Sequence, residues 1–294
     1  MGKKIFNEDF FQKLNKINMY INFKISNGTQ GGRKSKAKGV SVEFSDYREY
    51  TLGDDFRRID WNAYGKFDKF FIKIFMEERE GIFNFFIDKS KSMDYGENNK
   101  KETALKIVAA LSYIALNNLD RVNIATMNDG LLESVKSSTG NKGFQKVLRE
   151  LERIEFNGLT NLSSSIKKRP LNGKGVSIIV SDFLNNNGVE TLEEGLKYLA
   201  FKKQEIILIQ VLCEEELNPS IYNEVTVIDS ETGEQIKLSI TEALIEEYKN
   251  TLRNFNKRLE VLAKKYGGKF ISVNSSKSIE EIVLNDFNKK KVIY

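Results

Sequence analysis

Histidine is absent from this chain of 294 residues, and cysteine occurs once, at Cys213. Without histidine, catalytic sites of the Ser-His-Asp and Cys-His types are excluded, and so are zinc sites built from histidine and cysteine clusters. A single cysteine forms no internal disulfide, which is typical of the cytoplasm. The only two prolines, Pro170 and Pro219, both fall in predicted loops.

Long apolar runs are also missing. No stretch approaches the roughly 18 to 20 apolar residues that span a bilayer. Glu8 and Asp9 stand where a signal peptide would need an apolar segment. We therefore expect a cytoplasmic protein without stable membrane insertion. Neither a P-loop motif nor a G-x-G-x-x-G fingerprint occurs, which excludes a P-loop ATPase and weakens a dinucleotide-binding interpretation.

The excess of positive charge is small, with 46 Lys and Arg against 41 Asp and Glu. Much of the excess lies in residues 31–39 (GGRKSKAKG) and 289–291 (KKK). Short basic runs bind phosphate backbones in some proteins, but these two contain little aromatic character for base stacking. We expect solvated surface there and no nucleic-acid partner.

The most informative stretch is IFNFFIDKSKSM, residues 82–93. Its apolar run predicts a buried strand that ends at Asp88, and Ser90 and Ser92 follow at alternate positions. The loop after such a strand lies at the carboxyl edge of an α/β sheet, where ligands usually bind. One carboxylate and two hydroxyls suit Mg²⁺ or Mn²⁺ better than zinc or copper. The alternative is structural, because Asp and Ser also form turns and cap helices.

From residue 81 onward, strand and helix patterns alternate. This order predicts an α/β fold, a doubly wound, mostly parallel sheet with helices on both faces. The predicted strands are 82–87, 121–127, 131–135, 175–183, 205–212 and 269–273, with a hairpin at 224–240; the predicted helices are 102–119, 143–154, 189–202, 240–267 and 278–290.

Residues 1–80 differ from the rest, so we divide the chain into an N-terminal segment, 1–80, and a main domain, 81–294. Within the segment, nine charged residues and five large aromatic ones are interleaved between residues 43 and 61. Charges so interleaved with apolar groups tend to be partly buried and paired. We expect a β-containing segment docked on the main domain by a salt-bridge network; a catalytic role is the alternative.

Two further loops fall at the same predicted edge as Asp88. One contains Thr160, ahead of a short helical segment capped by Asn161 or Ser163, and the other contains Asp182 at the end of a buried strand. Because adjacent parallel strands bring these loops together, the five candidate ligands are expected to converge. They are Asp88, Ser90, Ser92, Thr160 and Asp182. They form an incomplete hard shell, which water or a partner's carboxylate would complete.

Asp88-x-Ser90-x-Ser92, followed by Thr160 and Asp182, resembles the metal-ion-dependent adhesion site of von Willebrand factor A domains. In addition, VEFSDYREYTLGDDFRRIDWNAYGK, residues 42–66, is similar to the signature of domain-of-unknown-function family fifty-eight. The resemblance implies a bacterial protein with a von Willebrand factor A-like domain, Mg²⁺ (or Mn²⁺) at those five residues, and a MoxR-type AAA+ ATPase as partner.

Three functions remain open. The first is a non-enzymatic, Mg-dependent module that binds an acidic residue of a protein partner, a MoxR-type AAA+ ATPase or its client, in protein remodelling or complex assembly. The second is a metal-dependent hydrolase of phosphate esters, although histidine is lacking as a general base and the spacing lacks a second aspartate. The third is a scaffold with a degenerate metal site.

Overall fold

The computed structural model describes residues 5–20, 43–76, 81–97, 99–129, 131–138, 140–171, 173–184, 188–219, 223–228 and 235–290. The chain divides into two compact units, Met1–Ile25 together with Gly81–Tyr294, and Ser26–Glu80. Helix α1 (Glu8–Tyr20) belongs to the larger unit. The division of the chain into a segment 1–80 and a main domain 81–294 stays a prediction.

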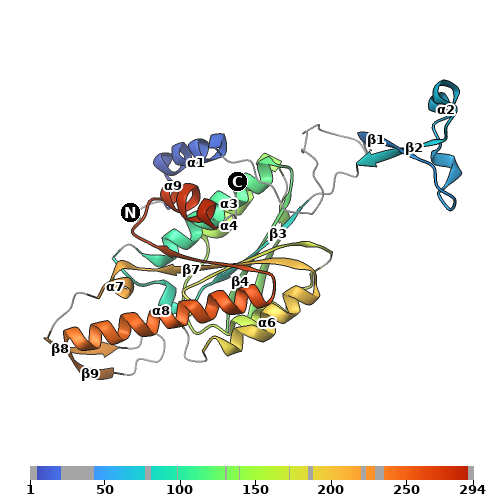
Figure 1. Cartoon of the computed structure of the whole chain (residues 1–294). Helices are drawn as coiled ribbons and strands as arrows, with labels where there is room; N and C mark the ends of the chain where they lie inside the picture. The colour runs from blue at the N-terminus through green and yellow to red at the C-terminus, as the bar shows by residue number, and fades with distance from the viewer. Residues whose placement is uncertain are drawn as a thin grey trace. The chain divides into compact units, whose positions relative to one another are not determined.

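The larger unit is built on a six-stranded sheet (Figure 1) in the order β10-β7-β6-β3-β4-β5. All neighbouring pairs are parallel except β4 and β5, which confirms the predicted doubly wound, mostly parallel sheet. The strands are β3 (Ile82–Asp88), β4 (Arg121–Asn128), β5 (Leu131–Ser138), β6 (Gly175–Ser181), β7 (Gln204–Leu212) and β10 (Lys269–Asn274). From β3 the chain first builds one half of the sheet and then returns to build the other, so the order reverses between β3 and β6.

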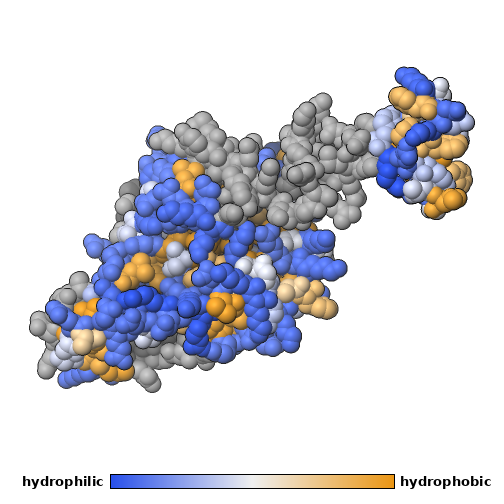
Figure 2. Space-filling model, in the orientation of Figure 1, coloured by the Kyte–Doolittle hydropathy of each residue, from blue (hydrophilic) through white to orange (hydrophobic). Residues whose placement is uncertain are grey.

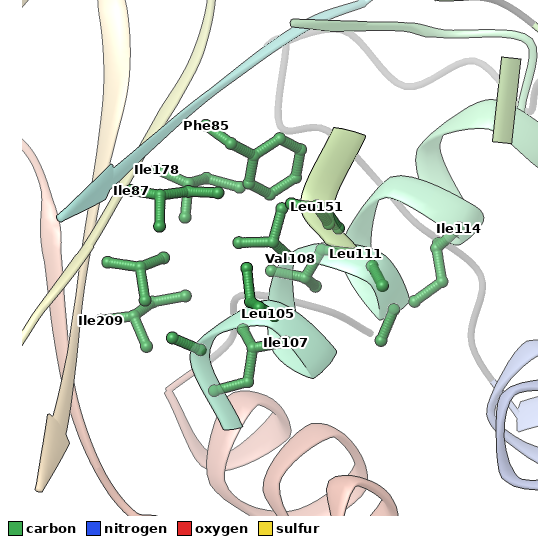
Figure 3. Close-up of a cluster of buried hydrophobic side chains, with 14 of the residues drawn as sticks. Phe85, Ile87, Leu105, Ile107, Val108, Leu111, Ile114, Leu151, Ile178 and Ile209 are labelled. Carbon is green, nitrogen blue, oxygen red and sulfur yellow. The ribbon is translucent and has the colours of Figure 1, made fainter. Parts of the chain in front are cut away.

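Helices cover both faces of this sheet (Figure 1), and a separate apolar core lies under each layer. Strand β3 contributes to both cores because its side chains alternate: Phe85 and Ile87 enter one core, and Phe86 the other. Figure 3 shows Phe85 and Ile87 packed against side chains of α3. These helices include α3 (Lys100–Asn117) and α4 (Gly140–Glu152) on the first face, and α5 (Leu162–Lys167), α6 (Glu190–Phe201) and α8 (Glu242–Lys265) on the second.

The predicted hairpin is confirmed as a separate antiparallel pair of β8 (Asn223–Ile228) and β9 (Gln235–Ile240), and its predicted turn lies outside the described residues. The C-terminal end departs from the predicted elements in one place. The predicted last helix is α9 (Ile279–Glu281) followed by a π-helical turn (Ile282–Phe287). Within the described part of the chain, no helix is both long and apolar enough to cross a bilayer.

In the smaller unit, an antiparallel pair of strands, β1 (Glu43–Glu49) and β2 (Phe71–Met76), is joined by a short 3₁₀ turn and helix α2 (Trp61–Phe67). Tyr64 of α2 stacks on Phe70 with ring centroids 4.6 Å apart. Apolar side chains remain on the surface of this unit (Figure 2); Phe56 and Phe67, for example, are 65% and 66% exposed.

Charged side chains of the smaller unit bond to near neighbours in the sequence. Arg48 pairs with Asp54 at 2.8 Å. Asp60 is buried, caps α2 by accepting from the backbone N–H of Asn62, and accepts the hydroxyl of Tyr47. Arg57, in contrast, is exposed. These bonds lie within the unit, and the docking of this segment on the larger unit stays a prediction.

Candidate metal site at the carboxyl edge of the sheet

The two candidate carboxylates lie at the ends of neighbouring strands. Asp88 is the last residue of β3, and Asp182 directly follows β6. These strands pair in parallel at the position where the strand order reverses. Such a reversal leaves a crevice outside the carboxyl ends of the strands, where ligands bind in open α/β sheets. The fold therefore brings both carboxylates to the expected ligand edge.

Asp88 is buried and accepts hydrogen bonds at both carboxylate oxygens. Its Oδ1 accepts from the Ser90 backbone N–H at 2.9 Å and from the Thr160 hydroxyl at 2.6 Å. Its Oδ2 accepts from the Ser181 hydroxyl at 2.6 Å. The first of these bonds forms the turn after β3, which is the structural role considered for Asp88. The other two connect the end of β3 to the loop of Thr160 and to the end of β6.

Backbone hydrogen bonds hold Thr160 against the Asp88 loop. Lys91 N–H donates to the carbonyl of Gly158 at 3.0 Å, and Asn157 N–H donates to the carbonyl of Lys89 at 2.8 Å. Gly158 has φ +74°, and a Cβ there would lie 3.0 Å from Asn128 Oδ1, so a larger residue would strain this loop. After Thr160 the chain enters α5, where Asn161 is the N-cap.

Ser90 and Ser92 lie in the 3₁₀ turn that follows β3, and their hydroxyl oxygens are 3.0 Å apart. Ser90 occupies the N-cap position, yet its side chain makes no capping hydrogen bond. Met93, fully buried, anchors the turn in the core. Ser90 is buried, whereas Ser92 and Thr160 are half-buried. The serines therefore present their oxygens to each other and not to the helix backbone.

Asp182 lies at the same edge but has different partners. Its Oδ1 accepts from the Leu184 backbone N–H at 3.0 Å, and its Oδ2 accepts from the Lys100 ammonium at 2.8 Å. The following residue, Phe183, has φ +58°, a conformation that is rare for a bulky side chain. A hydrogen bond from Phe183 N–H to the Ser181 hydroxyl oxygen stabilises this conformation.

Three residues of this edge were not predicted as part of the site: Ser181, Lys100 and Glu216. Lys100 is the first residue of α3, its side chain is 1% exposed, and it also pairs with Glu216 at 2.6 Å. Ser181 stands directly before Asp182, so its place in the strand was a usable signal. The sequence has no comparable signal for Lys100, because a lysine at a helix terminus is usually solvated.

Burial raises the pKa of Asp88, and the nearby charge of Asp182 raises it further, against the lowering effect of the three hydrogen bonds. Burial alone would lower the pKa of Lys100, but the carboxylates of Asp182 and Glu216 outweigh it, so this pKa is raised. The edge thus concentrates negative charge near Asp88 and keeps the lysine beside Asp182 in its charged form.

Two lysines flank the serines, and neither is paired with a candidate ligand. Lys89 forms an ion pair with Glu133 at 3.1 Å, and Lys91 is exposed.

The oxygens around Asp88 fit a hard divalent ion. Ligands at right angles in an octahedral Mg²⁺ shell lie about 2.9 Å apart, close to the 3.0 Å between the hydroxyls of Ser90 and Ser92. Because Thr160 donates its proton to Asp88, its oxygen keeps lone pairs for a cation. In the described part of the chain no three acidic or cysteine side chains form a metal-holding group, so an ion here depends on hydroxyl ligands.

The fold and this edge define a doubly wound α/β protein with a candidate hard-cation site at its topological reversal. The family described as "Protein of unknown function DUF58" matches residues 46–258. The chain belongs to this family. The match includes the smaller unit's α2 and all five candidate ligands.

Several relatives and structures are similar to this chain. Uncharacterized protein Rv1480 of Mycobacterium tuberculosis and uncharacterized protein Mb1516 of Mycobacterium bovis are each 23% identical over 242 residues, which cover 80% of this chain and 75% of theirs. Among solved structures, the conserved hypothetical protein BatB from Bacteroides thetaiotaomicron has a TM-score of 0.45 at 17% identity and covers 72% of this chain and 98% of its own. The SpRpn10 VWA domain has a TM-score of 0.39 at 10% identity and covers 70% and 95%.

Proposed function

We propose that this protein is a non-enzymatic binding module that holds Mg²⁺, or Mn²⁺ in its place, and uses the ion to bind an acidic side chain of a partner protein. The observation that carries the proposal is the hydrogen-bonded cluster of Asp88, Ser90, Ser92 and Thr160 at the reversal of the sheet. These residues would hold the ion, and Asp182 lies beside them. A bound divalent ion with an open position supplies a strong, directional contact to a carboxylate.

The partner we propose is a MoxR-type AAA+ ATPase, or a client that such an ATPase remodels, in the cytoplasm. The support is the resemblance of residues 42–66 to the family signature, since those family members are commonly encoded beside such ATPases.

The hydrogen bonds of Asp88 and Asp182 favour a partner-binding module over a hydrolase of phosphate esters. A hydrolase would need a free base to take a proton from water. Asp88 already accepts three hydrogen bonds, and Asp182 accepts from Leu184 and Lys100. The lone pair that these bonds leave on Asp88 is the one that the proposed ion would take, and the charge of Asp182 is neutralised by the Lys100 ammonium, so neither side chain is a free base.

Binding of the purified ATPase to the immobilised protein, measured by biolayer interferometry in Mg²⁺ and again in EDTA, tests the proposal. We expect binding in Mg²⁺, its loss in EDTA, and its loss in Asp88→Ala at every Mg²⁺ concentration. Ser239→Ala, which removes an exposed hydroxyl on β9, is the matched control and should bind like wild type. Equal binding in Mg²⁺ and EDTA would support the scaffold alternative instead.

A further inference from the structure

Positive charge gathers at the opposite edge of the large sheet, where β6 and β7 begin. Residues 165–176, from the last turn of α5 to the start of β6, and residues 195–204, at the end of α6, contain seven Lys and Arg and no Asp or Glu. We call these seven the amino-edge patch: Lys167, Lys168, Arg169, Lys174, Lys197, Lys202 and Lys203. Because the whole chain carries only +5, the rest of it is slightly acidic.

Hydrogen bonds hold the two basic segments together. The Tyr198 hydroxyl of α6 donates to the carbonyl of Arg169 at 2.6 Å. Gln204 Nε2 donates to the carbonyl of Gly173 at 2.9 Å and to that of Lys202 at 3.3 Å. Five of the seven cations are exposed, and the other two are half-buried. The fold therefore joins two segments about 30 positions apart into one basic surface.

The cations of the amino-edge patch lack the carboxylate partners that other lysines have. Lys265 and Lys269 pair with Glu193 and Glu205, whereas none of the ion pairs among the described residues includes a member of the patch. Burial lowers the pKa of Arg169, and no carboxylate acts against this effect. A surface with uncompensated charge of one sign is the kind that attracts a partner of the opposite sign.

Stabilisation of helix ends explains only part of the patch. Cations at the C-termini of α5 and α6 interact favourably with the helix dipoles, but Lys174 lies outside both helices. Lys203 follows the C-cap of α6 with φ +57°, a left-handed conformation that favours glycine. At the corresponding position after α8 the chain has Gly267, with φ +71°. Helix α6 thus ends on a strained lysine where α8 ends on the residue that the turn favours.

The composition of the patch favours a lipid surface as its partner. Six of the seven cations are lysines, point charges without the planar fork by which arginine recognises nucleic acids and protein carboxylates. Anionic lipids present diffuse negative charge, which requires no fixed geometry. Among these lysines the Phe201 ring is 79% exposed, with the Lys202 ammonium 5.9 Å from its centre. An aromatic ring beside cations is typical of side chains at a membrane interface.

We propose that the amino-edge patch docks the protein on a membrane that contains anionic lipids. The lysines lie against the headgroups, and the Phe201 ring enters the interface between them. This peripheral contact needs no membrane-spanning segment. The candidate metal site lies at the other end of the same strands, and the seven residues of β6 extend over roughly 20 Å. A docked protein therefore keeps that site free for a protein partner, and the docking does not depend on a bound ion.

Co-sedimentation of the purified full chain with vesicles tests the proposal. Wild type should bind vesicles of phosphatidylglycerol and phosphatidylcholine in equal amounts, less so at high salt, and should not bind phosphatidylcholine alone. The triple variant Lys168→Gln/Lys174→Gln/Lys203→Gln should bind the anionic vesicles roughly a hundredfold more weakly, at about fivefold for each cation.

The matched control is Lys142→Gln/Lys257→Gln/Lys289→Gln, which removes the same charge from exposed lysines outside the patch. Its vesicle binding should fall by less than about threefold, since these lysines do not face the headgroups. Far-UV circular dichroism establishes that both triple variants are folded. Equal losses in the two triple variants would overturn the proposal, because binding would then follow net charge and not the patch.

Two single variants separate docking from a structural role. Phe201→Ala leaves the charge unchanged and should weaken vesicle binding by about tenfold. Lys203→Gly should keep or raise the melting temperature, because glycine suits the left-handed turn, while binding falls by about fivefold. Wild-type binding to anionic vesicles in both single variants would contradict the proposed contact.

The partner class is tested with two soluble polyanions, labelled polyuridylate and polyglutamate, by fluorescence anisotropy. Binding of either one to wild type, with loss in the patch triple variant and no binding of wild type to anionic vesicles, would overturn the proposal in favour of RNA or an acidic protein. Failure of wild type to bind any of the three would equally overturn it.

Discussion

Charged side chains of the smaller unit bond to residues 2 to 20 positions away, as in Arg57 N–H to Asp55, Arg48 to Asp54 and Lys69 to Glu49. At the carboxyl edge of the large sheet, the bonds of Asp88 to Thr160 and of Lys100 to Glu216 span 72 and 116 positions. The first set is mostly exposed and the second mostly buried. Local, exposed pairs contribute little to stability, whereas each member of a buried pair depends strongly on its partner. Substitutions in the buried pairs should therefore lower the stability of the protein more than substitutions in the local, exposed pairs.

The largest effect is expected from Lys100→Ala. It leaves Asp182 buried without its counter-ion, which typically costs about 3–5 kcal/mol. The melting temperature of the larger unit should therefore fall by roughly 6–20 °C. Circular dichroism in metal-free buffer measures this change. The matched control is Lys101→Ala, since Lys101 pairs with Asp94 at the surface, and it should be close to wild type. Equal effects of the two variants would contradict the contrast between buried and local pairs.

Asp60→Ala is the exception within the smaller unit, because Asp60 is buried and caps α2. Loss of an N-cap costs about 0.5–2 kcal/mol, and loss of the Tyr47 bond adds to it. The only tryptophan, Trp61, lies in this unit, so its fluorescence during urea unfolding follows the unit directly. Asp55→Ala, at an exposed cap of a three-residue turn, is the control. An unchanged midpoint for Asp60→Ala would show that the cap is dispensable.

Asp88→Asn should stabilise the metal-free protein at neutral pH by about 1 kcal/mol, because it removes a buried charge near Asp182. The folded-state pKa of Asp88 is raised above the ordinary value of 3.8. The stabilisation that protonated Asp88 contributes to the folded state is therefore complete below pH 3.8. It is lost as the pH rises through the folded-state pKa of Asp88. Urea unfolding in EDTA should show a difference between variant and wild type at pH 7.5 that disappears near pH 3.5. A variant less stable than wild type at pH 7.5 would refute this.

The smallest effect is expected at the exposed Arg48–Asp54 pair. Hydrogen bonds from Arg48 and then Thr51 lower the pKa of Asp54 from 3.8 to about 2. Any stabilisation from Asp54 is thus present above 3.8 and lost as the pH falls toward 2. Arg48→Ala should raise this pKa toward its ordinary value without a measurable change in melting temperature. An NMR titration of the carboxyl carbon measures the pKa, and an unshifted value in the variant would exclude the pairing.

The same contrast explains how much could be predicted from the sequence. Strand β3 and its Asp-x-Ser-x-Ser turn are local patterns, and the parallel sheet that follows from alternating strands and helices brings Thr160 and Asp182 to Asp88. The cap role of Asp60 is also local, one residue before α2, but the density of charge around it suggested a salt-bridge network instead. The pairing of Lys100 with Asp182 and Glu216 has no local signature, because it depends on how α3, β6 and α7 (Glu214–Leu217) pack.

The most direct test of the central claim is a crystal structure of the protein grown with Mn²⁺, with anomalous difference density calculated at the manganese edge. The account predicts one peak at the carboxyl edge, about 2.1 to 2.2 Å from the hydroxyl oxygens of Ser90 and Ser92. Crystals grown at a saturating Mn²⁺ concentration that show no anomalous peak within coordination distance of Ser90, Ser92 and Thr160 would contradict this account.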